Sequence, residues 1–139
     1  MSQLKTTLYP VLHPLFAKHG RPLLREKTDS TDELVAVYDS MHTVVDALKQ
    51  SEFRTHTWLS TLKYCEIEGE RYYESSSWVY LPDGLTGKYQ YHVYLIKVEE
   101  KVRVYAHREA PWIQFRKHQN AAEYQTPGDP DGLVADALP

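Results

Sequence analysis

The sequence predicts an α+β fold, with one or two N-terminal helices packed on one face of a four- or five-stranded antiparallel meander sheet. Apolar residues recur every three or four positions between residues 31 and 50, which is typical of an amphipathic helix. Four later segments are rich in Thr, Val, Ile, Tyr and Trp, and turn-forming residues separate them. A chain of 139 residues can bury one core, so we expect a single domain over residues 1–118 and an extended acidic tail over residues 119–139.

The first 28 residues are expected to form an arm that contains a short helix. Pro14 suits the first turn of this helix, because proline is tolerated there. Gly20 suits its end, since glycine accepts the left-handed conformation that often terminates a helix.

The main helix is expected over residues 30–50. Ser30 and Glu33 match a capping box, in which each side chain bonds a backbone N–H group left over at the helix start. The apolar stripe of this helix must lie on another element. The stripe comprises Leu34, Val37, Tyr38, Met41, Val44, Val45 and Leu48.

The antiparallel sheet is expected over residues 54–116. Glu68-Gly69-Glu70 is expected to form the first hairpin turn, and Pro82-Asp83-Gly84 the next connection, because proline presets φ and glycine accepts a positive φ. The expected strands are 55–67, 71–81, 89–98 and 102–107, with a fifth short strand around 113–116.

The turn of the last hairpin predicts its register. If Glu99 and Glu100 form a two-residue turn, Val98 lies opposite Lys101 and the numbers of paired residues sum to 199. The pairs on the first face are Val93 with Ala106, Leu95 with Val104 and Lys97 with Val102, and those on the second face are His92 with His107 and Tyr94 with Tyr105. The first face is apolar, so we expect the main helix to cover it.

The second face mixes aliphatic, aromatic, His and Arg side chains, although the solvent side of a sheet is normally polar. Such residue types are frequent in buried protein interfaces, and basic and acidic blocks alternate along the chain. We therefore expect a non-enzymatic structural or protein-interaction subunit that self-associates through this face. It would form a homo-oligomer, or a ring- or tube-forming component of a virus-like or other large assembly. The expected interface residues are His92, Tyr94, Ile96, Arg103, Tyr105 and His107. Coverage of this face by the chain's own termini is the alternative.

A second hypothesis is binding of single-stranded nucleic acid by residues 101–118, where basic and aromatic side chains alternate. The residues concerned are Lys101, Arg103, Arg108, Trp112, Phe115, Arg116 and Lys117. The net charge of −3 argues against it, because nucleic-acid-binding domains are usually basic. A third hypothesis is a small-ligand carrier or enzyme that uses the cup between helix and sheet, lined by Trp78, Tyr89 and Tyr91.

We expect no catalytic residues, no cofactor and no metal site. The sequence contains no glycine-flanked serine nucleophile and no phosphate-binding glycine loop. The paired His92 and His107 would need a third metal ligand, for which His56 is the only other strand histidine. A second polar group, on the solvent side of the main helix, comprises Asp39, His42 and Asp46.

The location of the protein is expected to be cytoplasmic, or in a particle assembled in the cytoplasm. Cys65 is the only cysteine, so no disulfide forms within the chain. The first residues lack the pattern of a signal peptide. No stretch approaches the length of about 18 apolar residues that crosses a bilayer, so we expect no membrane insertion.

Overall fold

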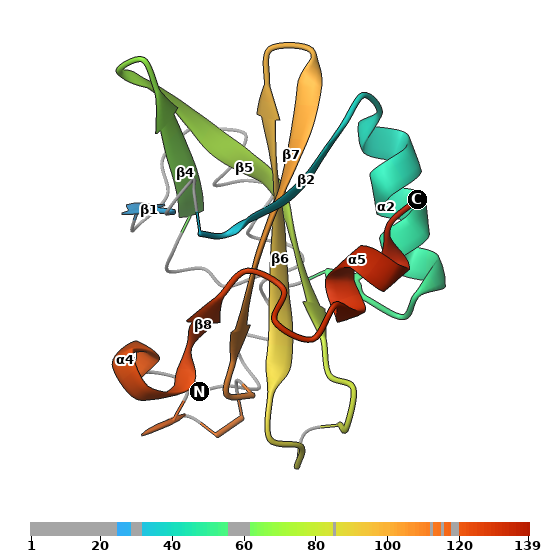
Figure 1. Cartoon of the computed structure of the whole chain (residues 1–139), viewed down its shortest axis with the longest axis vertical. Coiled ribbons are helices and arrows are strands. Elements are labelled where there is room, and N and C mark those ends of the chain that lie inside the picture. Colours follow the sequence, from blue (N-terminus) through green and yellow to red (C-terminus); the bar gives the residue numbers. More distant parts are fainter. Residues whose placement is uncertain are drawn as a thin grey trace.

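The computed structural model describes residues 25–28, 32–55, 62–84, 86–111, 113–114, 116–117 and 120–139. Within these ranges strands predominate and form one sheet in the order β1-β4-β5-β6-β7-β2, with β3 paired to β5 and β8 paired to β7 (Figure 1). The strands are β1 (Arg25–Lys27), β2 (Leu34–Tyr38), β3 (Arg54–Thr55), β4 (Leu62–Ile67), β5 (Glu70–Tyr80), β6 (Gln90–Val98), β7 (Lys101–Glu109) and β8 (Thr126–Pro127). The helices are α2 (Met41–Gln50), α4 (Ala121–Tyr124) and α5 (Leu133–Ala137). The predicted α+β fold, with helices on a four- or five-stranded meander, is therefore wrong: the described chain is mostly sheet, and β1 runs parallel to β4.

The segment predicted as one helix over residues 30–50 forms a strand in its first part and a helix in its second. Residues 34–38 form β2, which runs antiparallel to β7. A short apolar run fits a strand and a buried helix equally well, and the shape of Val and Tyr favours the strand. Pairing with β7 decides between them, because β2 supplies partners for backbone groups of β7. Glu33 consequently lies before a strand and does not cap a helix.

The helix that does form starts later, at Met41. Ser40 is its N-cap, with extended backbone angles and a side-chain Oγ that accepts a hydrogen bond from the Thr43 N–H at 3.3 Å. Val44 and Leu48 are fully buried against the sheet. Val37, which was expected on the same stripe, lies on β2 and is 50% exposed.

The predicted hairpins are confirmed. β6 and β7 pair in the expected register, from Gln90 opposite Glu109 to Val98 opposite Lys101. In the turn between β4 and β5, Glu68 and Gly69 both have positive φ, at 52° and 81°, as a tight hairpin turn of matching twist requires. The sequence therefore predicted the centre of the sheet correctly and its flanks incorrectly.

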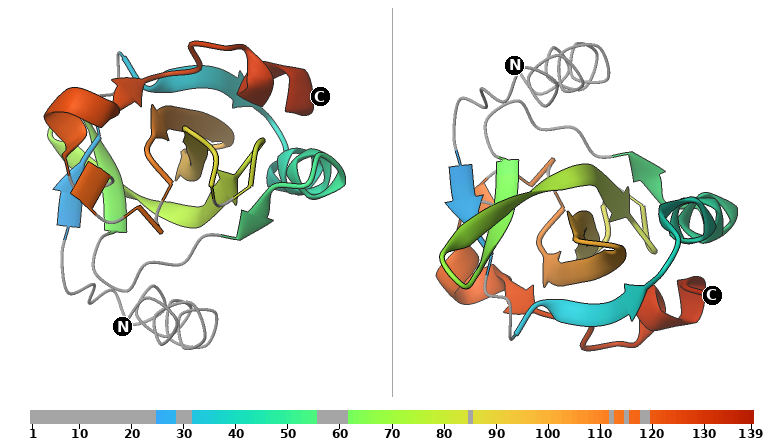
Figure 2. Two further views of the ribbon diagram at one scale, coloured as in Figure 1. Left: turned by 90° about the horizontal axis from the view of Figure 1, so that it is seen from below. Right: turned by 90° about the horizontal axis from the view of Figure 1, so that it is seen from above.

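The sheet curls around the β6–β7 hairpin, so that both faces of this hairpin are covered. Figure 2 shows α2 and α5 on one side of the hairpin and β1 and β4 on the other. We call these sides the helix face and the inner face. Irregular pairing at residues 74–76 of β5 and at residues 34–36 of β2 flanks the hairpin on both sides. Such bulges increase local twist and favour this curl.

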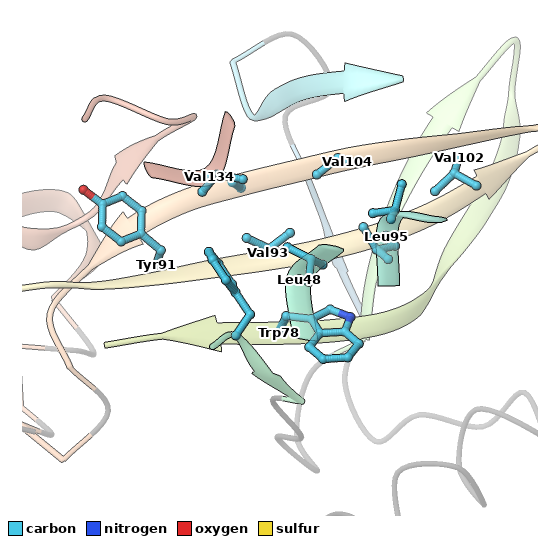
Figure 3. Packing of buried hydrophobic residues seen from close by; sticks show 11 residues of the cluster. Leu48, Trp78, Tyr91, Val93, Leu95, Val102, Val104 and Val134 are labelled. Atoms are coloured by element: carbon cyan, nitrogen blue, oxygen red, sulfur yellow. The ribbon is translucent and has the colours of Figure 1, made fainter. Parts of the chain in front are cut away.

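The helix face carries the larger apolar core, as predicted. Leu48 of α2 and Val134 of α5 lie against the side chains of β6 and β7 (Figure 3). The cluster comprises Val44, Leu48, Phe53, Trp78, Tyr91, Val93, Leu95, Val102, Val104, Ala106 and Val134. Burial of a Val or Leu side chain contributes about 1.5–3 kcal/mol. Trp78 and Tyr91 are only 3% and 1% exposed, so these two residues fill the core and do not line an open cup.

The C-terminal segment is folded, although an extended tail was expected over residues 119–139. It contains α4, β8 and α5, and Val134 is fully buried in the core. The Asp129 carboxylate accepts hydrogen bonds from the N–H groups of Val134 and Ala135 at 3.1 and 2.8 Å. Asp131 accepts bonds from Tyr91 and from Arg108. Of the acidic residues that suggested solvation, Asp131 therefore attaches this segment to the sheet, and Asp129 bonds the first turn of α5.

The arm and short helix expected within the first 28 residues lie outside the described residues up to residue 24. His56, Trp112 and Phe115 also lie outside them. The fifth strand expected near residue 113 is replaced by a turn, in which the Gln114 N–H donates to the Pro111 carbonyl at 2.9 Å. In the described part of the chain, no helix has the length and apolar character needed to cross a membrane.

Candidate functional site

Of the six residues expected to form an interface between chains, five are buried inside this one and Arg103 is partly exposed. Tyr94, Ile96 and Tyr105 have no exposed surface, and they form a second core on the inner face with Cys65 and Val98. These side chains therefore present no surface to another chain in this fold. The alternative, that the chain covers this face itself, describes the structure better.

Two stacked tyrosines form the middle of the inner face. The rings of Tyr94 and Tyr105 lie 5.6 Å apart and almost parallel, at 6°. Burial raises the pKa of Tyr105 to about 12, so its hydroxyl is neutral at ordinary pH. The Tyr94 hydroxyl contacts the Thr28 hydroxyl, which in turn donates to the Glu33 carboxylate. This chain of hydrogen bonds leads from the apolar part of the inner face to a polar part.

The polar part is built around the predicted histidine pair. His92 on β6 lies opposite His107 on β7, and their rings meet edge to face with centroids 4.9 Å apart. Glu109 follows His107 by two residues and so lies on the same face of the strand. Glu33 joins from the segment before β2, because its carbonyl accepts the Ala106 N–H at 2.8 Å and holds it beside β7. We call Glu33, His92, His107 and Glu109 the inner polar cluster.

One carboxylate oxygen lies at the centre of the inner polar cluster. Glu109 Oε1 is 3.2 Å from His107 Nε2 and 3.6 Å from His92 Nδ1. The Gln90 side-chain amide also donates to this oxygen, at 3.3 Å. One donor atom from each of His92, His107 and Glu109 lies within 4.8 Å of the others, which is a spacing compatible with a shared metal ion.

The remaining nitrogen of each histidine faces a second partner. His92 Nε2 is hydrogen-bonded to Ser77 Oγ on β5. His107 Nδ1 lies 3.4 Å from Glu33 Oε1, but within the described residues it makes no hydrogen bond. Both rings are therefore oriented with one nitrogen toward Glu109 and the other toward a neighbouring oxygen.

The cluster is nearly closed to solvent and electrostatically favours positive charge. The side chains of His92, His107, Glu109 and Glu33 are 11%, 2%, 9% and 11% exposed. Burial opposes the charged form of His107, but the neighbouring carboxylates of Glu109 and Glu33 outweigh it and raise the pKa of His107 to about 9.

The other polar group considered from the sequence does not assemble. His42 and Asp46 form an exposed pair on α2, with 3.0 Å between His42 Nε2 and Asp46 Oδ2. Asp39 precedes the helix and pairs with Lys101 instead. These residues are ordinary surface groups.

Three basic residues of the nucleic-acid hypothesis, Lys101, Arg103 and Arg108, are spread along β7 and already have partners. Lys101 pairs with Asp39 at one end of the strand, whereas Arg108 pairs with Asp131 and lies on the Tyr89 ring near the other end. Arg103 donates to the buried Tyr105. Arg116 and Lys117 are exposed. These contacts leave no continuous basic and aromatic strip on the described part of β7.

Sequence reasoning found the two histidines and missed the acids. Glu109 could have been found, because the same register that pairs His92 with His107 places Gln90 opposite Glu109. The expected strand ended at residue 107, and the strand in fact continues to Glu109. Glu33 carried no such signal, since its place depends on β2 pairing with β7.

Comparison of the chain with protein-family models, with curated proteins and with solved structures finds no match. The geometry of the inner polar cluster is therefore the basis on which a function can be proposed.

Proposed function

We propose that this protein binds a small cation in the inner polar cluster. The observation that carries the proposal is the convergence of two imidazoles and two carboxylates within one chain, on the inner face beside the stacked tyrosines. The proposal replaces self-association through this face, because five of the six side chains expected to make that contact are buried.

The acidic groups of the cluster support cation binding. The Glu33 and Glu109 carboxyl groups lie 3.4 and 3.2 Å from the two ring nitrogens of His107. Carboxylate oxygen and imidazole nitrogen are both donors that cations accept, and Glu109 Oε1 lies at the point where the donor atoms converge.

The position of the cluster also supports binding. Its members come from β6, β7 and the segment before β2, so the curled sheet brings together residues far apart in sequence. Residues on paired strands are held more rigidly than residues on loops, which keeps donor atoms in place before a ligand arrives.

The proposal is tested by thermal melting of the dialysed protein with a panel of inorganic and small organic cations. A cation at a hundred times its dissociation constant stabilises the folded state by about 2.7 kcal/mol, which is readily seen as a higher melting temperature. We expect at least one cation to raise the melting temperature of the wild type, and the effect to disappear in Glu109→Gln.

Glu74→Gln is the matched control. Glu74 is also a buried carboxylate, at 5% exposure, but it lies opposite Ile96, four residues along β6 from His92. This variant should respond to the cation as the wild type does. A panel in which no cation stabilises the wild type contradicts the proposal, as does an equal response of Glu109→Gln.

A further inference from the structure

The donor atoms of the cluster restrict the kind of cation. Two of the three converging donors, on His92 and His107, are imidazole nitrogens. Mg²⁺ and Ca²⁺ prefer oxygen donors, whereas imidazole suits Zn²⁺ and the neighbouring transition metals. Alkali ions and organic cations gain little from an imidazole lone pair.

Two donor spacings in the cluster are close to those around a tetrahedral ion of this class. Metal–nitrogen and metal–oxygen bonds of 2.0–2.1 Å at tetrahedral angles put neighbouring donors about 3.3 Å apart. Glu109 Oε1 lies 3.2 Å from His107 Nε2 and 3.6 Å from His92 Nδ1. Each of the three residues offers a donor atom within 4.8 Å of the others, so an ion between them draws on side chains that already share one face.

Each donor residue also has the outer partner that metal ligands usually have. Ligating histidines commonly donate their second N–H to a carboxylate or another oxygen, and ligating carboxylates are themselves hydrogen-bonded. His92 has Ser77 in this role, and Glu109 has Gln90. For His107 the partner is Glu33, whose Oε1 lies 3.4 Å from Nδ1.

The unbonded nitrogen of His107 is explained by the same arrangement. Within the described chain, His107 Nδ1 is a buried polar atom without a hydrogen bond. An ion on Nε2 fixes the remaining proton on Nδ1, directly toward Glu33. Each of the three metal ligands would then be oriented by an outer partner, and the Glu33 carboxyl group would lie beside the positively charged ion and His107.

Building on the proposed cation binding, we infer that the ligand is a divalent transition-metal ion of the Zn²⁺ and Co²⁺ type, coordinated by His92 Nδ1, His107 Nε2 and Glu109 Oε1. Three protein ligands leave one position of a tetrahedral ion for water or another small ligand. Glu33 is a positioning residue that acts through His107.

The test is Co²⁺ titration of the full chain, followed by visible absorption, because four-coordinate Co²⁺ absorbs much more strongly than the hydrated ion. We expect a saturable band at one equivalent, which one equivalent of Zn²⁺ removes. Glu109→Gln should lose the band. Glu33→Gln should keep it, with an affinity about 10- to 100-fold lower, as expected for an outer partner. Glu74→Gln should match the wild type.

A wild type without the band, or a Glu109→Gln variant that retains it, overturns the inference. Circular dichroism establishes whether each variant is folded. If Glu109→Gln is not folded, the test is instead made on the wild type, by following the NMR shifts of the ring nitrogens of His92 and His107 as Zn²⁺ is added. Unchanged shifts then contradict the site. If a cation of another class stabilises the wild type and no Co²⁺ band appears, cation binding stands and the transition-metal inference fails. If neither is seen, both fail.

Discussion

Single residues in the left-handed conformation show where this chain stores strain. Glu52 has a φ of 68° directly after α2. There its N–H donates to the Lys49 carbonyl at 3.2 Å, and the Phe53 N–H donates to the Leu48 carbonyl at 3.0 Å. This is the hydrogen-bond pattern of a Schellman motif, whose left-handed position is normally a glycine.

Replacing Glu52 by glycine is therefore expected to stabilise the fold. A left-handed conformation costs a residue with a Cβ roughly 1–2 kcal/mol, and glycine loses about 0.5–1 kcal/mol in chain entropy. The net gain in the free energy of unfolding should be about 0.5–1 kcal/mol, as measured by urea denaturation. A loss of stability would show that the Glu52 side chain makes contacts worth more than the strain.

Gly128 is a position where the left-handed conformation is already occupied by glycine and where a larger residue is expected to destabilise the fold. It has a φ of 84°, and an added Cβ would lie 3.0 Å from the Asp32 carbonyl oxygen. At this point the Gly128 N–H bonds to the Ala106 carbonyl, where the neighbour of β7 changes from β2 to β8. Only glycine fits this junction without distortion, and the junction holds Glu33 beside His107.

The histidine pair was predictable at this scale, Glu109 could have been predicted with it, and Glu33 could not. Alternation along β6 and β7 and a two-residue turn suffice to place His92 opposite His107. The same rule reaches Glu109 once the strand is extended by two residues. Glu33 depends on a pairing between distant segments, which no local pattern specifies.

At the scale of elements, the segment before Gln50 divides into a strand and a helix. Residues 34–38 are a run of only five mostly apolar residues, which is too short to distinguish the repeat of a helix from that of a strand. Pairing with β7 makes this run a strand. From Met41 onward the helical period is real, because Val44 and Leu48 are buried in the helix-face core. The prediction was therefore right about the face of the sheet that this helix covers and wrong about where the helix begins.

Truncation of Leu48 to alanine tests that packing. Leu48 has no exposed surface, and loss of a buried Leu side chain costs about 2–5 kcal/mol. Met41 is only partly buried at the edge of the same cluster, so Met41→Ala should cost less. Urea unfolding of both variants measures the difference. Equal losses would mean that the first turn of α2 packs as closely as the last.

At the scale of the whole molecule, one sheet serves two cores because it curls. Period-two alternation predicts which side chains share a face, but it does not specify what covers that face. The covering elements β1, β4 and the start of β2 reach the inner face through long-range pairing. Self-association of the protein stays a prediction, and it now requires a surface other than the inner face.

Replacing both Tyr94 and Tyr105 by glutamate distinguishes an internal face from a contact surface. Two charges in a fully buried, stacked pair should unfold the chain, because both lose their hydration and like charges placed side by side repel each other. Val37→Glu is the control, since Val37 is 50% exposed and should tolerate the charge. Near-ultraviolet circular dichroism and light scattering report the outcome. A folded double variant that merely dissociates from a larger species would restore the interface hypothesis.

The central claim is that the inner polar cluster binds one divalent transition-metal ion within a single chain. Native mass spectrometry of the protein after incubation with Zn²⁺ counts bound ions and chains in the same species. The structure predicts one ion per chain in the wild type, retained in Glu74→Gln and absent in Glu109→Gln. A wild type that binds no ion, or an ion that remains bound when Glu109 is replaced, would contradict the claim.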